Sequence, residues 1–439
     1  MRKQGLKRVL VLAFALGLVA AACGDDGDDD GGGASGGSAP EGSLRVPQDH
    51  DTIQEAVDAA QPGDLVYVDT GTYNESVTVT TENIVIRGAD RNETIVDGQF
   101  EEENCIFVVE TNGVAVENLT TQNCTNNGVF FTGVDGYRAS YVNAIRNGAY
   151  GIYAFDSTNG QFDHSYAAGS ADGGFYIGQC NPCNAVISDV ESEWNGLGYS
   201  GTNASGNLHI VSSSWHDNRV GVVPNSLTSE ELYPQGDIVI AGNTVYENNN
   251  DESAAVSIAQ TAIGNGILVA GGNDNVVEKN LVEDHDISGI AVIPLPETLL
   301  YEDREGAMDF NSTGNSVIDN VVTGSGRWDL GLVPSLEAAN TGDNCFSGNE
   351  AALTGPPDLQ TLLPCDAEGS GTFEAPIDEF AEIMLADKPD AIGYQDAELP
   401  DYEGENMPDA DSAPAEPPTS DNVPMTVDVA AITTPTSRT

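Results

Sequence analysis

The stretch Gly128-Val-Phe-Phe131 is followed by three variants of the same pattern, Gly151-Ile-Tyr-Ala154, Gly174-Phe-Tyr-Ile177 and Gly198-Tyr-Ser-Gly201. A glycine followed by β-favouring residues thus recurs about every 23 residues. With two longer gaps, the pattern continues as Gly221-Val-Val-Pro224, Gly266-Ile-Leu-Val269, Gly289-Ile-Ala-Val292 and Gly331-Leu-Val-Pro334. A period near 23 residues is typical of one coil of a three-sided solenoid, and a longer gap indicates a coil with an insertion.

Asparagines run in phase with this repeat. The set is Asn123, Asn147, Asn195, Asn218 and Asn248. The first four precede a glycine strand by a few residues, and Asn248 is separated from Gly266 by an insertion. Side chains stacked at equivalent corners can hydrogen-bond along the solenoid axis, so we interpret these asparagines as structural. The two periodicities together predict an all-β protein, a right-handed single-stranded parallel β-helix over residues 47–365.

The start of this region has the pattern of a cap. Thr52-Ile-Gln-Glu55 is a capping box, and Pro62-Gly63 ends the predicted helix before the first short strands. The segment resembles the pectin lyase-like superfamily of right-handed parallel β-helices, on the residues Thr52-Ile-Gln-Glu-Ala-Val-Asp-Ala-Ala60, Pro62-Gly-Asp64, Gly71-Thr-Tyr73 and Ile84-Val-Ile-Arg-Gly88. The resemblance implies the fold and an N-terminal capping helix. It implies little about activity, because this scaffold carries lyases, hydrolases, epimerases, adhesins and inert spacers.

The first residues have the pattern of an export signal. A basic start and a short apolar run lead to Ala20-Ala-Ala-Cys23, which resembles the lipobox of bacterial lipoproteins but departs from it at Ala20. The basic and apolar pattern predicts a signal peptide over 1–23, and the resemblance implies a lipid on Cys23. The composition of 24–46 predicts a Gly/Asp-rich tether. The alternative is an ordinary secretory peptide cut nearby. We expect an exported protein anchored at the cell envelope on the extracytoplasmic side, touching the membrane only through its lipid.

The charge balance narrows the range of partners. Asp and Glu number 70 against 15 Lys and Arg, a formal net charge of −55. This negative charge excludes nucleic acid and anionic lipid headgroups as binding partners. It suits binding of neutral or cationic glycans or of divalent cations, or adaptation to a saline habitat. Residues 366–439 form an acidic, proline-rich tail with one short predicted helix over 373–386. The rest of this tail is predicted to be flexible, partly disordered or draped over the coils.

Six cysteines lie after Cys23, and an even number in an exported chain favours disulfides. Cys105 and Cys124 are about one coil apart, Cys180 and Cys183 suit a local bridge, and Cys345 and Cys365 suit a clamp at the C-terminal end. Other pairings stay open on the sequence alone. A single Cys-x-x-Cys segment is weak evidence for zinc, and the chain lacks the βαβ context of a redox motif.

The second residue after each glycine should point outward if the first points inward. Phe130, Tyr153 and Tyr176 occupy this position on successive coils, which stack about 4.8 Å apart, so their rings should form a ladder suited to sugar rings. Asp156, Gln179 and Asn225 follow the same strands and offer hydrogen bonds. Insertions near 225–235, 249–263 and 294–313 border this face and predict a groove. The alternative is that these loops cover the ladder as a second core.

Candidate catalytic groups are scattered. In enzymes like pectate lyase, carboxylates hold calcium while an Arg or Lys removes a proton. The candidates of these residue types are Arg219, Lys279, Arg327, Asp156, Asp163 and Asp172. The five histidines (His50, His164, His209, His216, His285) show no metal-ligand spacing, so no metal site is predicted, although calcium stays an open alternative. Any acid or base is expected first in Trp215–Arg219 or Glu283–Asp286.

We therefore expect a monomeric surface lipoprotein that binds a polysaccharide or cell-surface glycan along the aromatic groove, and that could also process it, without an obligatory cofactor. The alternative is a structural or adhesive lipoprotein without catalytic activity. Metal delivery, a third alternative, is disfavoured because the His and Met residues are not clustered. The sequence does not identify catalytic residues.

Overall fold

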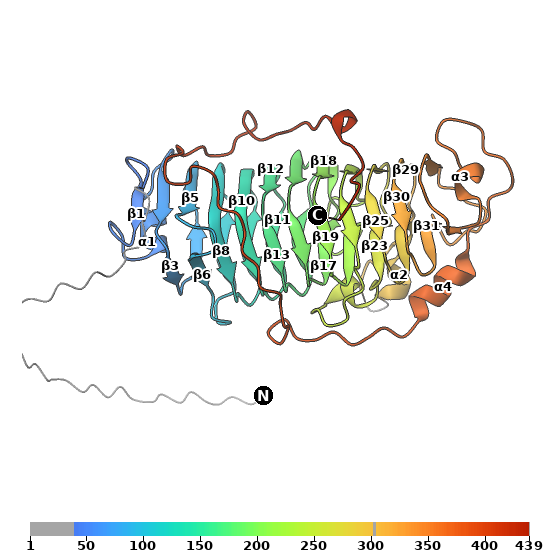
Figure 1. The fold of residues 1–439 in the computed structure, drawn as a ribbon, viewed down its shortest axis with the longest axis horizontal. Coiled ribbons are helices and arrows are strands. Elements are labelled where there is room, and N and C mark those ends of the chain that lie inside the picture. Colours follow the sequence, from blue (N-terminus) through green and yellow to red (C-terminus); the bar gives the residue numbers. More distant parts are fainter. Residues whose placement is uncertain (1–38, 302–303, 439) are drawn as a thin grey trace, which may run out of the picture. The chain divides into compact units, whose positions relative to one another are not determined.

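The computed structural model describes residues 39–301 and 304–438. Short parallel strands stack coil upon coil in three rows (Figure 1). The long strands β8 (Val114–Gln122) and β10 (Asp135–Ile145) run through two rows and join them into one sheet, while the third row forms a separate sheet. The solenoid predicted from the glycine repeat is therefore confirmed, and the signal peptide with Cys23 lies outside the described residues.

The strand bounds follow the repeat. The first row contains β2 (Leu65–Val68), β5 (Ile84–Gly88), β12 (Thr158–Asp163), β15 (Ala185–Ser188), β18 (Ser205–Val211), β21 (Gly236–Ala241), β24 (Val276–Glu278), β29 (Ser316–Ile318) and β32 (Cys345–Ser347). The second row contains β3 (Gly71–Tyr73), β6 (Thr94–Asp97), β13 (Tyr166–Ala168), β16 (Glu191–Glu193), β19 (Ser214–His216), β22 (Thr244–Tyr246), β25 (Leu281–Glu283) and β30 (Val321–Thr323). The third row contains β4 (Val77–Val79), β7 (Asn104–Val109), β9 (Asn127–Thr132), β11 (Tyr150–Phe155), β14 (Gly173–Gly178), β17 (Leu197–Thr202), β20 (Val220–Asn225), β23 (Asn265–Ala270), β26 (Ser288–Ile293), β31 (Trp328–Leu332) and β33 (Thr354–Gly355).

The third row shows why its sequence repeats. In seven coils the first residue after the glycine points inward, and neighbouring coils align these residues in the order Val129, Ile152, Phe175, Tyr199, Val222, Ile267 and Ile290, all fully buried. Leu330, which follows Asp329, takes the same buried position in the next coil. Stacking like residues on successive coils builds one continuous core. The repeat pattern aligned Gly331 with Gly289, and this alignment is wrong by two residues. In the structure Gly331 pairs with Ala291.

The glycine column has a steric cause. A Cβ atom on Gly128, Gly151 or Gly221 would lie 2.5–2.6 Å from the carbonyl oxygen of the glycine on the next coil. Such an approach is far inside van der Waals contact, so the backbone of successive coils can meet at this corner only without a side chain. The repeat that identifies the fold is therefore a packing requirement.

Buried amides form ladders along the axis. Asn195 donates to Asn218 at 3.1 Å, Asn218 donates to Asn248 at 3.0 Å, and Asn248 meets His285 at 3.2 Å. Asn123 lies outside the ladder because its neighbour Cys124 occupies the equivalent position, donating its backbone N–H to Asn147. The sequence analysis missed two more ladders. One contains Asn243, Asn280, Asn320 and Asn349, and the other contains Gln235, Asn275, Asn315 and Asn344.

Different elements lie at the two ends of the solenoid. At the N-terminal end, helix α1 (Ile53–Ala59) begins at Thr52, whose hydroxyl accepts from the Glu55 N–H. Strand β1 (Leu44–Val46) pairs with β2, so the coils begin inside the segment that we predicted as tether. At the C-terminal end lie helices α3 (Leu359–Leu362) and α4 (Ile377–Leu385). The remaining short elements lie in loops or the tail and are η1 (Ser257–Gln260), β27 (Leu295–Pro296), α2 (Glu297–Leu300), β28 (Asp309–Phe310) and η2 (Val429–Ala431).

Three disulfides join Cys105 to Cys124, Cys180 to Cys183, and Cys345 to Cys365. These are the pairs that the spacing suggested. The first joins neighbouring coils, and the third joins β32 to the segment that follows the last strand. The bridges therefore restrain local loops and the C-terminal end of the solenoid.

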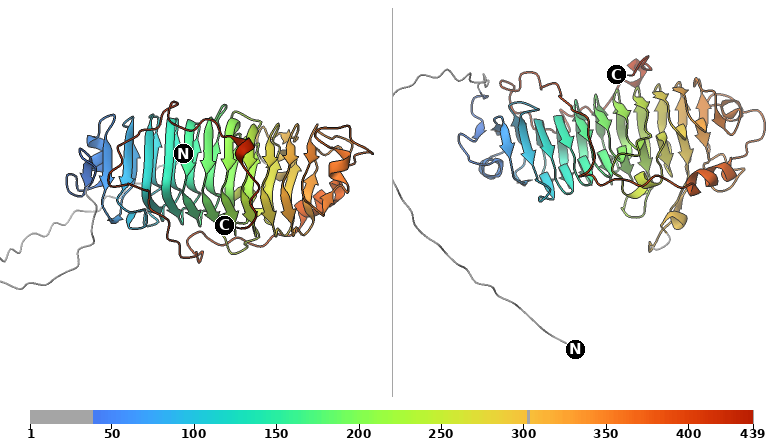
Figure 2. Two further views of the ribbon diagram at one scale, coloured as in Figure 1. Left: turned by 45° about the horizontal axis from the view of Figure 1, so that its top comes forward. Right: turned by 60° about the horizontal axis from the view of Figure 1, so that its bottom comes forward.

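The acidic tail lies along the coils. After α4 it crosses the strands toward the N-terminal end, turns, and runs back to the middle of the solenoid (Figures 1 and 2). Basic side chains of the coils donate to its backbone carbonyls, namely Arg87, Arg91, Arg138, Arg146, Arg219 and Lys279. The draped alternative thus describes the tail better than a free, flexible chain, because the tail supplies acceptors to these basic side chains.

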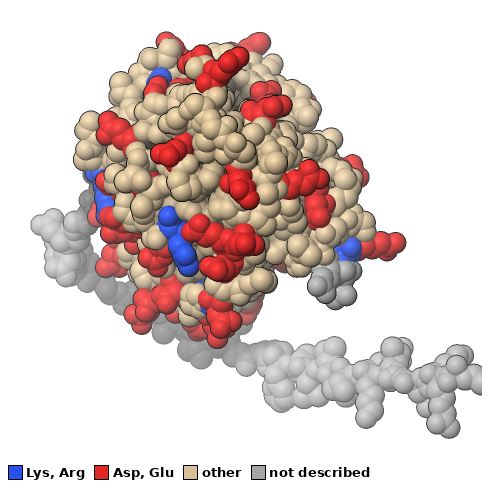
Figure 3. All heavy atoms as spheres, turned by 90° about the vertical axis from the view of Figure 1, so that its right-hand side faces the viewer, with Lys and Arg blue, Asp and Glu red and all other residues tan. Residues whose placement is uncertain are grey.

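The surface keeps the charge imbalance of the sequence. Figure 3 shows the molecule from the end of the solenoid where α3 lies. On this face acidic side chains are scattered widely and basic ones are few. No helix among the described residues is both long enough and apolar enough to cross a bilayer.

Candidate functional site

Aromatic rings form a ladder on the outer side of the third row. Phe107 stacks on Phe130 with ring centroids 5.1 Å apart, and Phe130 stacks on Tyr153 at 4.5 Å. These three rings are half-buried, because each stands on the outward position of its strand. Phe107 was missed in the sequence because β7 lacks the glycine marker, although its register with Phe130 places it in the same column.

The ladder ends at Tyr176, which meets Tyr153 edge to face at 4.6 Å. Tyr176 is fully buried, and its hydroxyl donates to Glu230 Oε1 at 2.6 Å. Glu230 belongs to the loop between β20 and β21, the first predicted insertion. The loop therefore closes over Tyr176 and brings a carboxyl group to the end of the ladder. Sequence reasoning placed the loop beside the groove but had no signal for this glutamate.

A second carboxyl group lies beside the same rings. The hydroxyl of Tyr150 hydrogen-bonds to Asp172, and Tyr150 stacks on Tyr153 at 4.4 Å. Burial raises the pKa of Asp172 to about 6. Burial also raises the pKa of Glu230 to about 7, opposed by the hydrogen bond from Tyr176 and assisted by the charge of Asp172. Both groups therefore titrate near neutral pH, as acids and bases at functional sites commonly do.

Polar atoms in this part of the fold have hydrogen-bonding capacity to spare. Glu230 Oε2 and Gln179 Oε1 are buried, and neither has a hydrogen-bond partner among residues 39–301 and 304–438. Buried polar atoms in folded proteins almost always bind a protein group, water or a ligand. These free acceptor atoms lie at the end of the ladder where Glu230 and Tyr176 are found. They are therefore suited to accept hydrogen bonds from a molecule that carries hydroxyl groups.

The other predicted binding residues, Asp156 and Asn225, differ in exposure. Asp156 is exposed just beyond the end of β11, where a ligand can reach it. Asn225 is only 1% exposed, accepts from the Thr202 hydroxyl and donates to the Val223 carbonyl. Asn225 is thus a buried structural amide. Its prediction as a ligand-binding residue is corrected, because hydrogen bonds inside β17 and β20 use both of its polar atoms.

The C-terminal half of the third row is covered. Leu268 and Ala291 continue the outward column, but Ile258 of η1 and Phe380 of α4 pack above them around an apolar cavity of about 40 Å³. There the inserted loops act as a second core, as the alternative interpretation expected. The open ladder is confined to the N-terminal half, from Phe107 to Tyr153.

The predicted bases do not gather at the ladder. Arg219 is fully buried and donates to backbone carbonyls of Ala259 and Pro389, whereas Lys279 binds the Val429 carbonyl. Arg327 is half-exposed, 3.8 Å from Glu379. Asp163 lies in the first row, where it accepts from Ser140 and contacts His164. Of the six catalytic candidates, Asp172 is thus the one whose side chain lies against the aromatic rings and has a strongly raised pKa.

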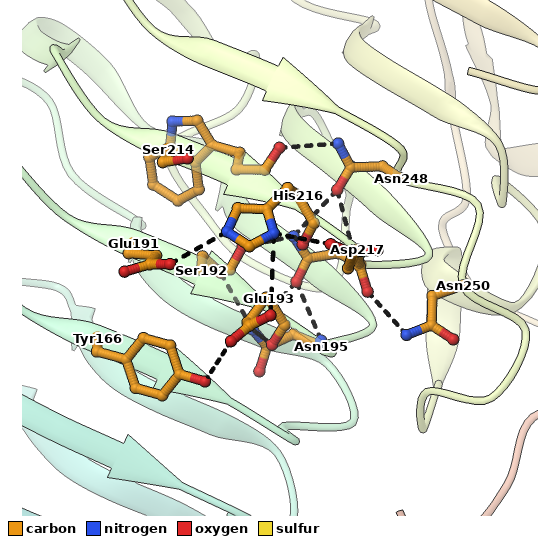
Figure 4. Close-up of polar contacts among 12 residues, drawn as sticks. Tyr166, Glu191, Ser192, Glu193, Asn195, Ser214, His216, Asp217, Asn248 and Asn250 are labelled. Carbon is orange, nitrogen blue, oxygen red and sulfur yellow. Dashed lines mark hydrogen bonds and ion pairs between the residues drawn. The ribbon is translucent and has the colours of Figure 1, made fainter. Parts of the chain in front are cut away.

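The two histidine-containing corners differ. His285 is buried in the asparagine ladder, and burial lowers its pKa to about 3. His216 lies on the outer side of the second row among Glu191, Glu193 and Asp217 (Figure 4). Burial opposes its charge, but hydrogen bonds to Asp217 and Glu191 outweigh that effect and raise its pKa to about 9. This acidic cluster belongs to a different row from the aromatic ladder.

Comparison with known proteins agrees with the architecture. Residues 127–294 match the family described as "Right handed beta helix region". The A-modules of the mannuronan C-5 epimerases AlgE4 and AlgE6 from Azotobacter vinelandii are similar structures, with TM-scores of 0.49 and 0.48 and identities of 15% and 17%. The first comparison covers 73% of this chain and 94% of the epimerase module, and the second covers 74% and 94%.

A rhamnogalacturonan lyase is also similar, with a TM-score of 0.46 and 14% identity over 81% of this chain and 92% of the lyase. Comparison with curated protein sequences gives no match. The residues of the candidate site are therefore interpreted from their own geometry.

Proposed function

We propose that this right-handed parallel β-helix protein binds a carbohydrate chain across Phe107, Phe130 and Tyr153. The observation that carries the proposal is a half-exposed stack of rings leading to two carboxyl groups, Asp172 and Glu230, with raised pKa values. Ring faces suit the apolar faces of sugars, and the spare acceptor atoms suit their hydroxyl groups. Because the chain is strongly acidic, a neutral or basic polysaccharide fits better than a polyanion.

The test is glycan-array binding by the purified full chain, with and without calcium. The variant Phe130→Ala/Tyr153→Ala removes two half-exposed rings and leaves the buried Tyr176 in place. We expect it to lose at least tenfold in affinity for the glycan that the wild type binds. Tyr394→Ala, which removes a ring that packs against Phe100, is the matched control and should bind normally.

Equal binding by all three proteins would place the glycan elsewhere on the surface. Absence of binding to any neutral, basic or acidic glycan would favour the alternative, a structural or adhesive protein. Circular dichroism of each variant separates loss of the site from loss of the fold.

A second candidate function is cleavage of the bound glycan, favoured by the pKa values of about 6 for Asp172 and about 7 for Glu230. A carboxylic acid that stays protonated near neutral pH can donate to a leaving-group oxygen, and its ionised partner can act as base. Product analysis after incubation with the bound glycan tests this activity. Asp172→Asn and Glu230→Gln should abolish products while retaining binding, and unchanged products from both variants would contradict the assignment.

We also propose that the chain is exported and anchored at the cell envelope by a lipid on Cys23. The support is the sequence Ala20-Ala-Ala-Cys23 after a basic and apolar leader. Mass spectrometry of the membrane fraction should find the mature chain beginning with a lipid-modified cysteine. The variant Cys23→Ser should move the protein to a soluble fraction, and wild-type protein without lipid would contradict the anchor.

A further inference from the structure

The cluster around His216 has the composition and arrangement of metal ligands. His216 Nδ1 lies 2.9 Å from Asp217 Oδ2 and 3.9 Å from Glu193 Oε2. The three ligand atoms all lie within 4.8 Å of one another. Ligand atoms bound tetrahedrally to one zinc-sized ion at about 2.1 Å lie about 3.4 Å apart. Closing the widest gap of the cluster on such an ion thus takes about 1.4 Å at most, shared between two side chains.

The imidazole ring is held in the orientation that such a site needs. Its other nitrogen, Nε2, lies 3.2 Å from Glu191 Oε1 (Figure 4). The ring stacks on Tyr246 with centroids 4.6 Å apart and an interplanar angle of 3°. A carboxylate on one ring nitrogen fixes the tautomer that presents the opposite nitrogen to a metal. Glu191 therefore serves as the positioning residue for His216.

The second ligand, Glu193, is also held in place. The hydroxyl of Tyr166 donates to Glu193 Oε1 at 2.7 Å, which leaves Oε2 directed toward His216. The side chains of His216 and Glu193 are only 9% and 12% exposed. Limited exposure and fixed orientation lower the entropy cost of collecting the ligands, so the cluster is more organised than three acids on an open surface.

The local charge favours a divalent cation. Three carboxylates, from Glu191, Glu193 and Asp217, surround the single imidazole. The nearby tail arginine, Arg438, pairs instead with Glu247, Glu283 and Asp284. Even with His216 protonated, the cluster carries excess negative charge, and a divalent ion neutralises it better than one proton does.

We propose that His216 Nδ1 and the carboxylates of Glu193 and Asp217 bind one divalent transition-metal ion of the zinc class. Binding exchanges the Nδ1 proton, which is released to solvent, for the metal ion. A nitrogen ligand selects such ions over calcium, which prefers oxygen ligands alone. Three protein ligands leave a fourth position for water or for a group of another molecule.

The experiment is calorimetric titration of the metal-free full chain, purified without a polyhistidine tag, with zinc chloride in the presence of excess calcium. We expect one zinc ion to bind tightly per chain. Because binding releases a proton, the measured heat should change with the ionisation enthalpy of the buffer. Cobalt as a probe should give a visible absorption band from a site with low coordination number. Both His216→Gln and Glu193→Gln should weaken binding at least tenfold, and Glu191→Gln should weaken it about tenfold.

His164→Gln is the matched control. His164 is also paired with an aspartate, Asp163, 2.7 Å away, but it forms no ion pair with a second carboxylate among the residues that the structure describes. The affinity of this variant for zinc should equal that of the wild type. Absence of zinc binding, or equal binding by wild type and His216→Gln, overturns the proposal and leaves an ion-pair network. Circular dichroism without metal shows whether each variant is folded, and Glu193→Gln tests the site with the imidazole intact.

Discussion

Tyr176 both packs against the aromatic ladder and donates a hydrogen bond to a carboxyl group of the candidate site. Its ring closes the aromatic ladder, and its buried hydroxyl donates to Glu230. We predict that Tyr176→Phe lowers the free energy of unfolding at pH 8 by about 1–3 kcal/mol, because the Glu230 carboxylate loses a buried donor. The same change should raise the pKa of Glu230 above its value of about 7. Urea unfolding and an NMR titration measure the two effects, with Tyr394→Phe as control; no change in either would contradict this role.

Asp172 and Glu230 also predict how stability depends on pH. Their ordinary pKa values are 3.8 and 4.5, and burial raises them to about 6 and about 7 in the folded chain. The folded state therefore holds protons that the unfolded state releases first, so their stabilising effect is full below pH 4 and is lost as pH rises to about 7. Asp172→Asn/Glu230→Gln should flatten this part of the stability profile by on the order of 1–2 kcal/mol per group. An unchanged slope would contradict the buried protonation.

At the scale of elements, the asparagine ladders hold neighbouring coils at one corner. Asn218 accepts from Asn195 and donates to Asn248 and to the carbonyl of Ser192. We predict that Asn218→Ala lowers the free energy of unfolding by about 2 kcal/mol or more, because it leaves several buried groups unsatisfied. The exposed Asn74 is the control, and Asn74→Ala should change stability by less than about 0.5 kcal/mol. Equal unfolding midpoints for the two variants would show that the ladder is dispensable.

At the scale of the whole molecule, the tail acts as a clamp across many coils. Tyr402 stacks on Tyr166 with centroids 3.5 Å apart, and Val427, Val429 and Ile432 pack against the coils. Removing residues 387–439 should lower the free energy of unfolding by at least about 2 kcal/mol, the scale of one or two charged hydrogen bonds. The β-sheet signal in circular dichroism should persist, since the rows of strands do not include the tail. A truncated chain as stable as the full chain would show that the tail does not clamp the coils.

Much of the fold could be predicted from local sequence because every coil obeys the same packing rule. The column of glycines is required by backbone contact, and the inward residues are required to be apolar, so both repeat along the chain. The site was predictable only in part. Tyr153 and Phe130 follow from the repeat, whereas Glu230 comes from an insertion with no period, and Phe107 lacks the glycine marker.

The sequence by itself determined the coil, the inward and outward alternation of its side chains and the outward ladder, because each depends on residues within one or two coils. The cysteine spacing suggested three local pairs, and the structure decided the pairing. Only the tertiary structure decided which part of the ladder stays open, where the tail lies, that Glu230 binds Tyr176, and that Asp172 binds Tyr150 beside the same rings. It also brought Glu193 and His216 together from separate strands. The open part of the ladder, the path of the tail and the position of Glu230 depend on how inserted loops and the tail fold back over the coils, and that packing leaves no period in the sequence. Glu193 and His216 stand on paired strands of neighbouring coils, β16 and β19, so their approach depends on how the two side chains are directed.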